Sequence, residues 1–462
     1  MNNISDDTIA AVATAPGVSG IGIIRISGKN SLNVIDKIFK NVNGESTGII
    51  NAKSHTIHYG FIYDNDEVID EVLVSIMLSP RSYTTEDTVE INCHGGPFVI
   101  RRVLQTVFKY GARPAEPGEF TKRAFLNGRI DLTKAESVMD LISSGNEFAR
   151  KNSLKTLRGS VYKKIYDYRD RIIHETAFIE SALDDPEHYS LDGYPDILRQ
   201  KVIELKDEIE DLLSHSSDGK ILSEGIDTCL VGKPNVGKSS LLNLLAGEDK
   251  AIVTDIPGTT RDAVEVKIQF GGLTLNMMDT AGIRDTEDTV EKIGVEKSRN
   301  AIEISDLVLF VLDSSTSLDD DDIEIFGSIK DKKSIIILNK SDLEPVTTIE
   351  SIKKYSDAPI VVVSAINEEG MDGLLHIVRE MFLSGEISSN DQVYITNERQ
   401  LSDLRSVKES LSLVINSIDN GMSEDFFTVD LMDAYDKLGA VIGEETGDDL
   451  ADRIFSEFCM GK

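Results

Sequence analysis

Residues 232–239 carry the clearest chemical pattern in the chain. They read Gly-Lys-Pro-Asn-Val-Gly-Lys-Ser, which matches GxxxxGK[ST], and they lie between an apolar run at 226–231 and a helical pattern at 240–245. In such a loop, backbone N–H groups point at phosphate oxygens, Lys238 neutralises the β- and γ-phosphates, and the Ser239 hydroxyl binds Mg²⁺. The alternative is an ordinary glycine turn between a strand and a helix, which this length and context disfavour.

Three shorter motifs follow in the order of a guanine-nucleotide domain. Residues 279–282, Asp-Thr-Ala-Gly, end an apolar run, so that the carboxylate can hold Mg²⁺ through water and the glycine N–H can reach the γ-phosphate. Residues 339–342, Asn-Lys-Ser-Asp, end the run 334–338, and the Asp342 carboxylate can accept two guanine N–H groups that adenine lacks. Residues 364–365, Ser-Ala, can read guanine O6 through a backbone N–H. Together the four motifs predict a GTP-hydrolysing enzyme.

The GTP-binding residues predicted from these four motifs are Asn235, Val236, Gly237, Lys238, Ser239, Ser240, Asp279, Thr280, Ala281, Gly282, Asn339, Lys340, Asp342, Ser364 and Ala365.

Three stretches outside these motifs carry a resemblance to a known family. Residues 254–262, Thr-Asp-Ile-Pro-Gly-Thr-Thr-Arg-Asp, resemble the first switch of the TrmE–Era–EngA group of GTPases. This resemblance implies that GTP is also bound by Thr254, Asp255, Ile256, Pro257, Gly258, Thr259 and Thr260. The last five residues, Phe-Cys-Met-Gly-Lys, are similar to the FCxGK tail of the MnmE (TrmE) family. Residues 82–87, 93–96 and 117–132 resemble that family's folate-binding domain. The resemblance covers the whole chain, which is identified as a member of this family of tRNA modification GTPases.

The resemblance implies how the phosphate would be cleaved. Ras-type enzymes place a water-orienting glutamine directly after the Asp-x-x-Gly motif, but Ile283 stands there in this chain. The resemblance implies that K⁺ supplies positive charge near the phosphate and that Glu291 positions the attacking water. Glu291 belongs to the acidic stretch 285–291, and residue chemistry alone does not single out one carboxylate in that stretch. The implied metal ligands are Asn235, Thr254, Ile256 and Thr259 for K⁺, and Ser239 and Thr260 for Mg²⁺.

The resemblance also implies a modification reaction. A homodimer would work with the flavoprotein MnmG, as a heterotetramer that contacts tRNA, to add a carboxymethylaminomethyl-type group to C5 of the wobble uridine. The one-carbon unit would come from a tetrahydrofolate derivative, and Cys459 would be catalytic. The implied folate-binding residues are Arg25, Glu86, Arg129 and Lys462. Two positions depart from the family pattern: Arg129 stands where lysine is expected, and Thr85 where glycine is usual.

The elements that must position these residues follow three patterns. Residues 1–118 show short alternating apolar runs and two helical stretches, which predict an α+β domain. The resemblance implies that this domain binds folate and dimerises. Residues 119–216 and 386–462 have apolar residues at helical spacing, for example from Leu154 to Ile179, and predict a discontinuous helical domain. Between them, 217–385 predict an inserted Ras-like GTPase domain with a mainly parallel sheet. The expected fold class is therefore multidomain, α/β and α.

Composition narrows the function further. The chain has 462 residues, with 80 Asp+Glu against 48 Lys+Arg, so its formal charge of −32 repels nucleic acid at long range and favours a local or partner-borne tRNA contact. Its 3 cysteines show no CxxC spacing, and each is expected to be a small buried hydrophobe, except Cys459 beside Lys462. The chain start lacks a signal-peptide pattern and no apolar run approaches about 20 residues, so a soluble cytoplasmic protein is expected.

Two alternatives remain open at this stage. A ribosome-assembly switch of the Era type would explain the nucleotide motifs, but it leaves the N-terminal domain and the C-terminal tail unexplained. It would also be expected to carry a basic RNA-binding module, and this acidic chain shows none. The other alternative is a nucleotide-gated scaffold, in which the flavoprotein makes the bonds.

Overall fold

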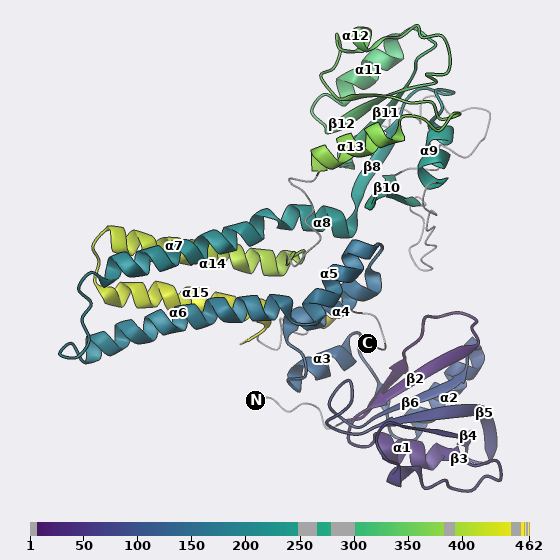
Figure 1. The fold of residues 1–462 in the computed structure, drawn as a ribbon. Coiled ribbons are helices and arrows are strands. Elements are labelled where there is room, and N and C mark those ends of the chain that lie inside the picture. The colour runs from purple at the N-terminus through teal and green to yellow at the C-terminus, as the bar shows by residue number, and fades with distance from the viewer. Residues whose placement is uncertain are drawn as a thin grey trace. The chain divides into compact units, whose positions relative to one another are not determined.

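A computed structural model describes residues 7–247, 266–278, 301–382, 393–444, 454–456, 458 and 461 (Figure 1). The chain divides into two compact units. The first comprises Met1–Met139, Thr156–Val202 and Ser406–Lys462, and the second comprises Asp140–Lys155 and Ile203–Arg405. The predicted domain boundaries after residues 118, 216 and 385 stay a prediction. No helix among the described residues is both long and apolar enough to cross a bilayer.

A seven-stranded sheet forms the N-terminal part of the first unit, in the order β3-β4-β5-β6-β2-β1-β7. Its neighbouring strands are antiparallel except for the parallel pair β1 and β7. Alternate strand residues such as Ile24, Ile26 and Val74 are buried in one core with Val34 of α1 and Val103 of α2. This arrangement confirms the predicted α+β fold. The elements are β1 (Ile9–Val12), β2 (Ile21–Ser27), α1 (Ser31–Ile38), β3 (Phe39–Lys40), η1 (Ile49–Asn51), β4 (Thr56–Asp64), β5 (Glu67–Met77), β6 (Thr88–His94), α2 (Pro97–Lys109) and β7 (Arg113–Pro114).

The other regular elements that the structure describes in the first unit are helices. The apolar spacing from Leu154 to Ile179 is divided between α5 and α6, because Gly159 adopts a left-handed conformation with φ of 87° and ends the helical path. Within this unit α6 packs on α15, and the Arg169 guanidinium lies 4.0 Å from the centre of the Tyr435 ring. The helices wholly or partly in this unit are α3 (Glu119–Leu126), α4 (Leu132–Ser143), α5 (Glu147–Leu157), α6 (Ser160–Asp184), α7 (Tyr194–Ser214), α14 (Glu398–Asp419) and α15 (Glu424–Ile442).

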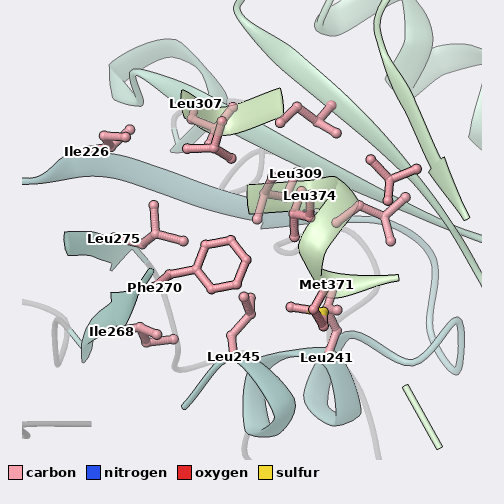
Figure 2. Close-up of a cluster of buried hydrophobic side chains, with 14 of the residues drawn as sticks. Ile226, Leu241, Leu245, Ile268, Phe270, Leu275, Leu307, Leu309, Met371 and Leu374 are labelled. Atoms are coloured by element: carbon pink, nitrogen blue, oxygen red, sulfur yellow. The ribbon is translucent and has the colours of Figure 1, made fainter. Parts of the chain in front are cut away.

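The second unit contains a six-stranded sheet in the order β13-β12-β11-β8-β10-β9. Among the strands that the structure describes here, only the edge strand β9 is antiparallel to its neighbour, which confirms the prediction of a mainly parallel sheet. Every residue of β12 is buried, because Ile335 and Ile337 face one core and Ile336 and Leu338 face another (Figure 2 shows the first core). The elements are α8 (Ser216–Glu224), β8 (Ile226–Val231), α9 (Lys238–Gly247), β9 (Val266–Phe270), β10 (Leu273–Met278), β11 (Leu307–Asp313), α11 (Asp320–Ser328), β12 (Ser334–Asn339), α12 (Ile349–Ile352), β13 (Ile360–Val362) and α13 (Met371–Phe382).

The burial predicted for two cysteines is confirmed. Cys93 and Cys229 are both free and buried. Burial raises the pKa of the Cys93 thiol to about 11 and raises the pKa of Cys229 as well. Neither thiol is therefore ionised near neutral pH, so neither is suited to act as a nucleophile.

Candidate functional site

The predicted phosphate loop connects β8 to the first turn of α9. Gly232 and Gly237 have positive φ values of 146° and 100°. A Cβ atom at Gly232 would lie 2.4 Å from the Val311 carbonyl oxygen, and one at Gly237 would lie 2.2 Å from Nδ2 of Asn339. Only glycine fits this backbone without a clash, so the two glycines of the motif fix the shape of the loop.

The ammonium group of Lys238 is already held by this loop. Its Nζ donates to the carbonyl oxygens of Gly232 at 2.6 Å and Lys233 at 2.7 Å. Burial lowers the pKa of Lys238 below its usual value. Since an ammonium group has three N–H donors, these two bonds leave one donor for a phosphate oxygen.

The predicted guanine-reading residues lie at the ends of two neighbouring strands of the same sheet and in the loops that follow them. Asn339 ends β12, its Nδ2 donates to the Val236 carbonyl at 2.9 Å, and its Oδ1 accepts from the Ala365 N–H at 3.2 Å. Ser364 is fully buried and donates to Oδ1 of Asp342 at 2.7 Å, while the Asp342 residue itself stays exposed. One asparagine therefore ties the phosphate loop to the loop after β13, and a buried serine orients the carboxylate.

Many predicted nucleotide and metal residues lie outside the described part of the chain. These are Thr254, Asp255, Ile256, Pro257, Gly258, Thr259, Thr260, Asp279, Thr280, Ala281, Gly282 and Glu291. Cys459 and Lys462 also lie outside it. The predicted residues that are described in this unit lie on the loops after β8, β12 and β13, in the first turn of α9 and at the end of β12.

The first unit brings two of the predicted folate-binding cations to one aromatic ring. The guanidinium carbons of Arg25 and Arg129 lie 5.6 Å and 4.8 Å from the centre of the Tyr83 ring. Arg25 also pairs with Glu90 at 2.8 Å and donates to the carbonyl oxygen of Gly461 at 3.3 Å. The penultimate residue of the chain therefore lies beside the predicted site.

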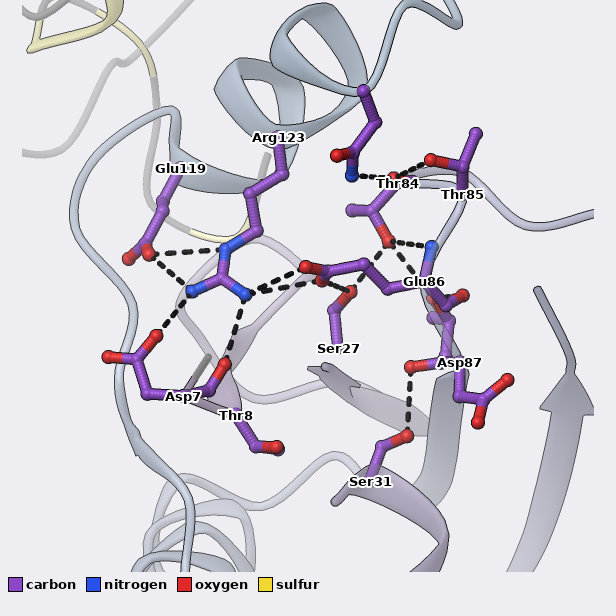
Figure 3. A network of polar contacts seen from close by, with 12 residues as sticks. Asp7, Thr8, Ser27, Ser31, Thr84, Thr85, Glu86, Asp87, Glu119 and Arg123 are labelled. Atoms are coloured by element: carbon purple, nitrogen blue, oxygen red, sulfur yellow. Dashed lines mark hydrogen bonds and ion pairs between the residues drawn. The ribbon is translucent and has the colours of Figure 1, made fainter. Parts of the chain in front are cut away.

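The Glu86 carboxylate belongs to a buried ion-pair network (Figure 3). Its two oxygens accept from Nη1 of Arg123 at 3.1 and 3.2 Å, and one also accepts from Ser27 Oγ at 2.7 Å. Arg123 is only 4% exposed at its side chain and also pairs with Asp7 and Glu119, each at 2.9 Å. Arg123 is not among the residues predicted from the sequence, although Glu119 lies four residues earlier on the same helix, a spacing typical of an ion pair.

The backbone conformation at Thr85 explains why the family usually has glycine at this position. Its φ of 63° is the left-handed conformation that glycine adopts without cost, so the backbone has the shape expected for glycine although threonine occupies it.

Thr85→Gly should remove this strain and raise the free energy of unfolding by roughly 0.5–1 kcal/mol. Chemical denaturation would measure it. Thr88→Gly, in the buried strand β6, is the matched control and should destabilise the fold; a loss for Thr85→Gly equal to that of the control would contradict the expectation.

Nearly the whole chain matches known proteins in sequence. Residues 8–129 match the family described as GTP-binding protein TrmE N-terminus, and residues 132–459 match the MnmE helical domain. A protein named tRNA modification GTPase MnmE from Lachnoclostridium phytofermentans is 54% identical over 99% of both chains. Proteins of that name from Clostridioides difficile and Bacillus subtilis are 46% and 43% identical over 99% of this chain and 99% and 100% of theirs. Among solved structures, Aquifex aeolicus Era is 26% identical, covers 41% of this chain and 67% of its own, and has a TM-score of 0.27.

Proposed function

We propose a detailed function on the premise that this chain belongs to the MnmE family of tRNA modification GTPases, with relatives up to 54% identical along nearly the whole length. It is a GTPase of tRNA modification. The observation that carries the nucleotide role is the bonding of Asn339 to both the phosphate loop and Ala365, which joins the phosphate and guanine ends of one site. Family membership also removes the ribosome-assembly alternative.

Two metal ions complete the proposed nucleotide site. Ser239 is exposed in the first turn of α9, directly after Lys238, and its hydroxyl suits Mg²⁺ together with Thr260. Asn235 is exposed in a left-handed conformation with φ of 64°, and its side-chain oxygen suits K⁺ together with Thr254, Ile256 and Thr259. Bound metal ions supply positive charge near the transferring phosphoryl group. In this proposal Glu291 positions the attacking water.

The potassium proposal predicts a specific loss. Asn235→Gly preserves the left-handed backbone but removes the side-chain oxygen, so GTP hydrolysis in KCl should fall by about 10²-fold toward the rate in NaCl. Asn235→Asp, which keeps an oxygen, should retain part of the K⁺ stimulation. Phosphate release at saturating GTP, compared in KCl and NaCl at equal ionic strength, measures both. Equal rates of the unmodified chain in the two salts would refute the proposal.

We propose that a homodimer of the chain, assembled with the flavoprotein MnmG, adds a carboxymethylaminomethyl-type group to C5 of the wobble uridine. A tetrahydrofolate derivative supplies the one-carbon unit when bound. Arg25, Arg129 and Lys462 would hold the glutamate tail of the folate, and Glu86 would accept pterin N–H groups. The two arginines that share the Tyr83 ring support this cation site. Because Arg123 already donates to both Glu86 oxygens, a bidentate pterin contact would have to share or displace that donor.

A cysteine substitution separates the two activities. Cys459→Ser should hydrolyse GTP at the normal rate but leave the wobble uridine unmodified, because a thiolate is a far better nucleophile than a hydroxyl. Nucleoside analysis of tRNA from cells carrying only this variant measures the modification. Cys93→Ala is the matched control and should support modification, since Cys93 is buried away from solvent. Full modification by Cys459→Ser would exclude a chemical role for that residue.

A further inference from the structure

Lys233, the second residue of the phosphate loop, is fixed through its side chain to the start of α11. Its Nζ lies 2.6 Å from Oδ2 of Asp319 and 2.8 Å from Oδ2 of Asp322. The two aspartates are themselves joined by a capping box, in which each side chain accepts from the other's backbone N–H. The lysine side chain is therefore held by two carboxylates whose own positions are fixed by the helix start.

The Lys233–Asp322 pair is a buried one. The Asp322 side chain is 3% exposed, and its Oδ1 has no hydrogen-bond partner among the residues that the structure describes. A buried carboxylate needs a compensating charge, and within this described set Lys233 supplies it. The pairing raises the pKa of Lys233 even though burial opposes it, and lowers the pKa of Asp319. Lys233 therefore stays charged at neutral pH.

The same residue also controls the phosphate-binding lysine. The Lys233 carbonyl oxygen accepts from Nζ of Lys238 at 2.7 Å, so the orientation of that peptide group determines where the ammonium of Lys238 points. The side chain of Lys233 anchors the residue that carries this carbonyl group, and the preceding residue, Gly232, has no room for a Cβ atom beside the Val311 carbonyl oxygen. The loop thus connects α11 to the charge that meets the β- and γ-phosphates.

We propose that Lys233 is a positioning residue for nucleotide binding: its ion pairs with Asp319 and Asp322 hold the phosphate loop so that Lys238 is aimed at the β- and γ-phosphates of GTP. This inference rests on the proposed nucleotide role of the loop and adds a residue that the phosphate-loop motif leaves unspecified. It predicts a phosphate-dependent defect, since GMP lacks the phosphates that Lys238 would contact.

Dissociation constants of GTP, GDP and GMP test the proposal by calorimetry on the full chain. Lys233→Met should weaken GTP and GDP about tenfold and leave GMP within about twofold, and Lys233→Arg should restore part of the loss. Lys220→Met is the matched control, because Lys220 pairs with Glu398 at 2.8 Å in the same unit and should leave all three affinities unchanged. An equal loss for all three nucleotides, or none, would overturn the proposal; failure of the unmodified chain to bind GTP would instead refute the nucleotide role.

A double-mutant cycle separates positioning from simple loss of stability. In a Lys238→Ala background, Lys233→Met should have no further effect on the ratio of GTP to GMP affinity, because the residue through which it acts is gone. Adding Asp322→Asn to Lys233→Met removes the uncompensated carboxylate and should recover the melting temperature while the GTP defect persists. Recovery of GTP affinity together with the melting temperature, or additive losses in the cycle, would show that Lys233 acts only through folding.

Discussion

Asp342→Asn is expected to change the nucleotide that this GTPase uses from GTP to xanthosine triphosphate. The Asp342 carboxylate accepts from Ser364 through one oxygen and is exposed, so its remaining lone pairs are available to guanine N–H donors. An asparagine amide would instead oppose its own N–H₂ group to the 2-amino group of guanine. Xanthine carries a carbonyl oxygen at that position, which the amide can donate to, so the mismatch is removed.

The expected loss of GTP hydrolysis is large because the substitution leaves a polar group of guanine without a hydrogen-bond partner in the site. Hydrolysis of GTP at subsaturating concentration should fall by about 10²-fold or more, while kcat/KM for xanthosine triphosphate should rise by a similar factor. Phosphate release with the two nucleotides measures both values. Asp357→Asn, at an exposed aspartate of the same unit, is the matched control and should retain GTP preference. A variant that loses both nucleotides would contradict this assignment of Asp342.

The GTPase sheet was predictable because its strands β11 and β12 are buried on both faces. The run of residues 335–338 is apolar at every position, so its length and the polar motif that follows are enough to place β12 and Asn339 at its end. The link from Asn339 to Val236 was not predictable, because it joins residues 103 positions apart that meet only in the folded sheet. Motif order thus predicted which loops form the site but not the bonds between them.

The ion-pair network of the first unit, in contrast to the GTPase sheet, was not predictable from the sequence. On sequence alone Glu86 has the default interpretation of an ordinary surface charge, yet its side chain is only 17% exposed and faces Arg123. The contact between Arg123 and Asp7 spans 116 positions, and no periodicity or motif encodes such a pair. The break at Gly159 was missed for a related reason: apolar spacing continues across it, while the positive φ belongs to the backbone.

Arg123→Met is expected to destabilise the first unit by about 3–5 kcal/mol. The substitution keeps much of the side-chain volume but leaves the carboxylates of Glu86, Glu119 and Asp7 without the guanidinium that they share, and only Glu119 and Asp7 keep a second arginine, Arg113. Calorimetry of the full chain would show the loss as a lower melting temperature. Arg102→Met, which removes an exposed pair with Glu67, is the control and should cost less than about 1 kcal/mol.

The effect should also depend on pH in a defined direction. Burial raises the pKa of Glu119 and of Asp7, but hydrogen bonds from Arg113 and Arg123 outweigh it and hold both pKa values below their usual range. A carboxyl group with a lowered pKa in the folded state stabilises the fold above its unfolded pKa, near about pH 4, and that stabilisation disappears as the pH falls through the folded value. The difference in melting temperature between the unmodified chain and Arg123→Met should therefore be full at neutral pH and shrink below about pH 4. A difference that stays constant through this acid range would mean that Arg123 stabilises the fold by packing and not by charge.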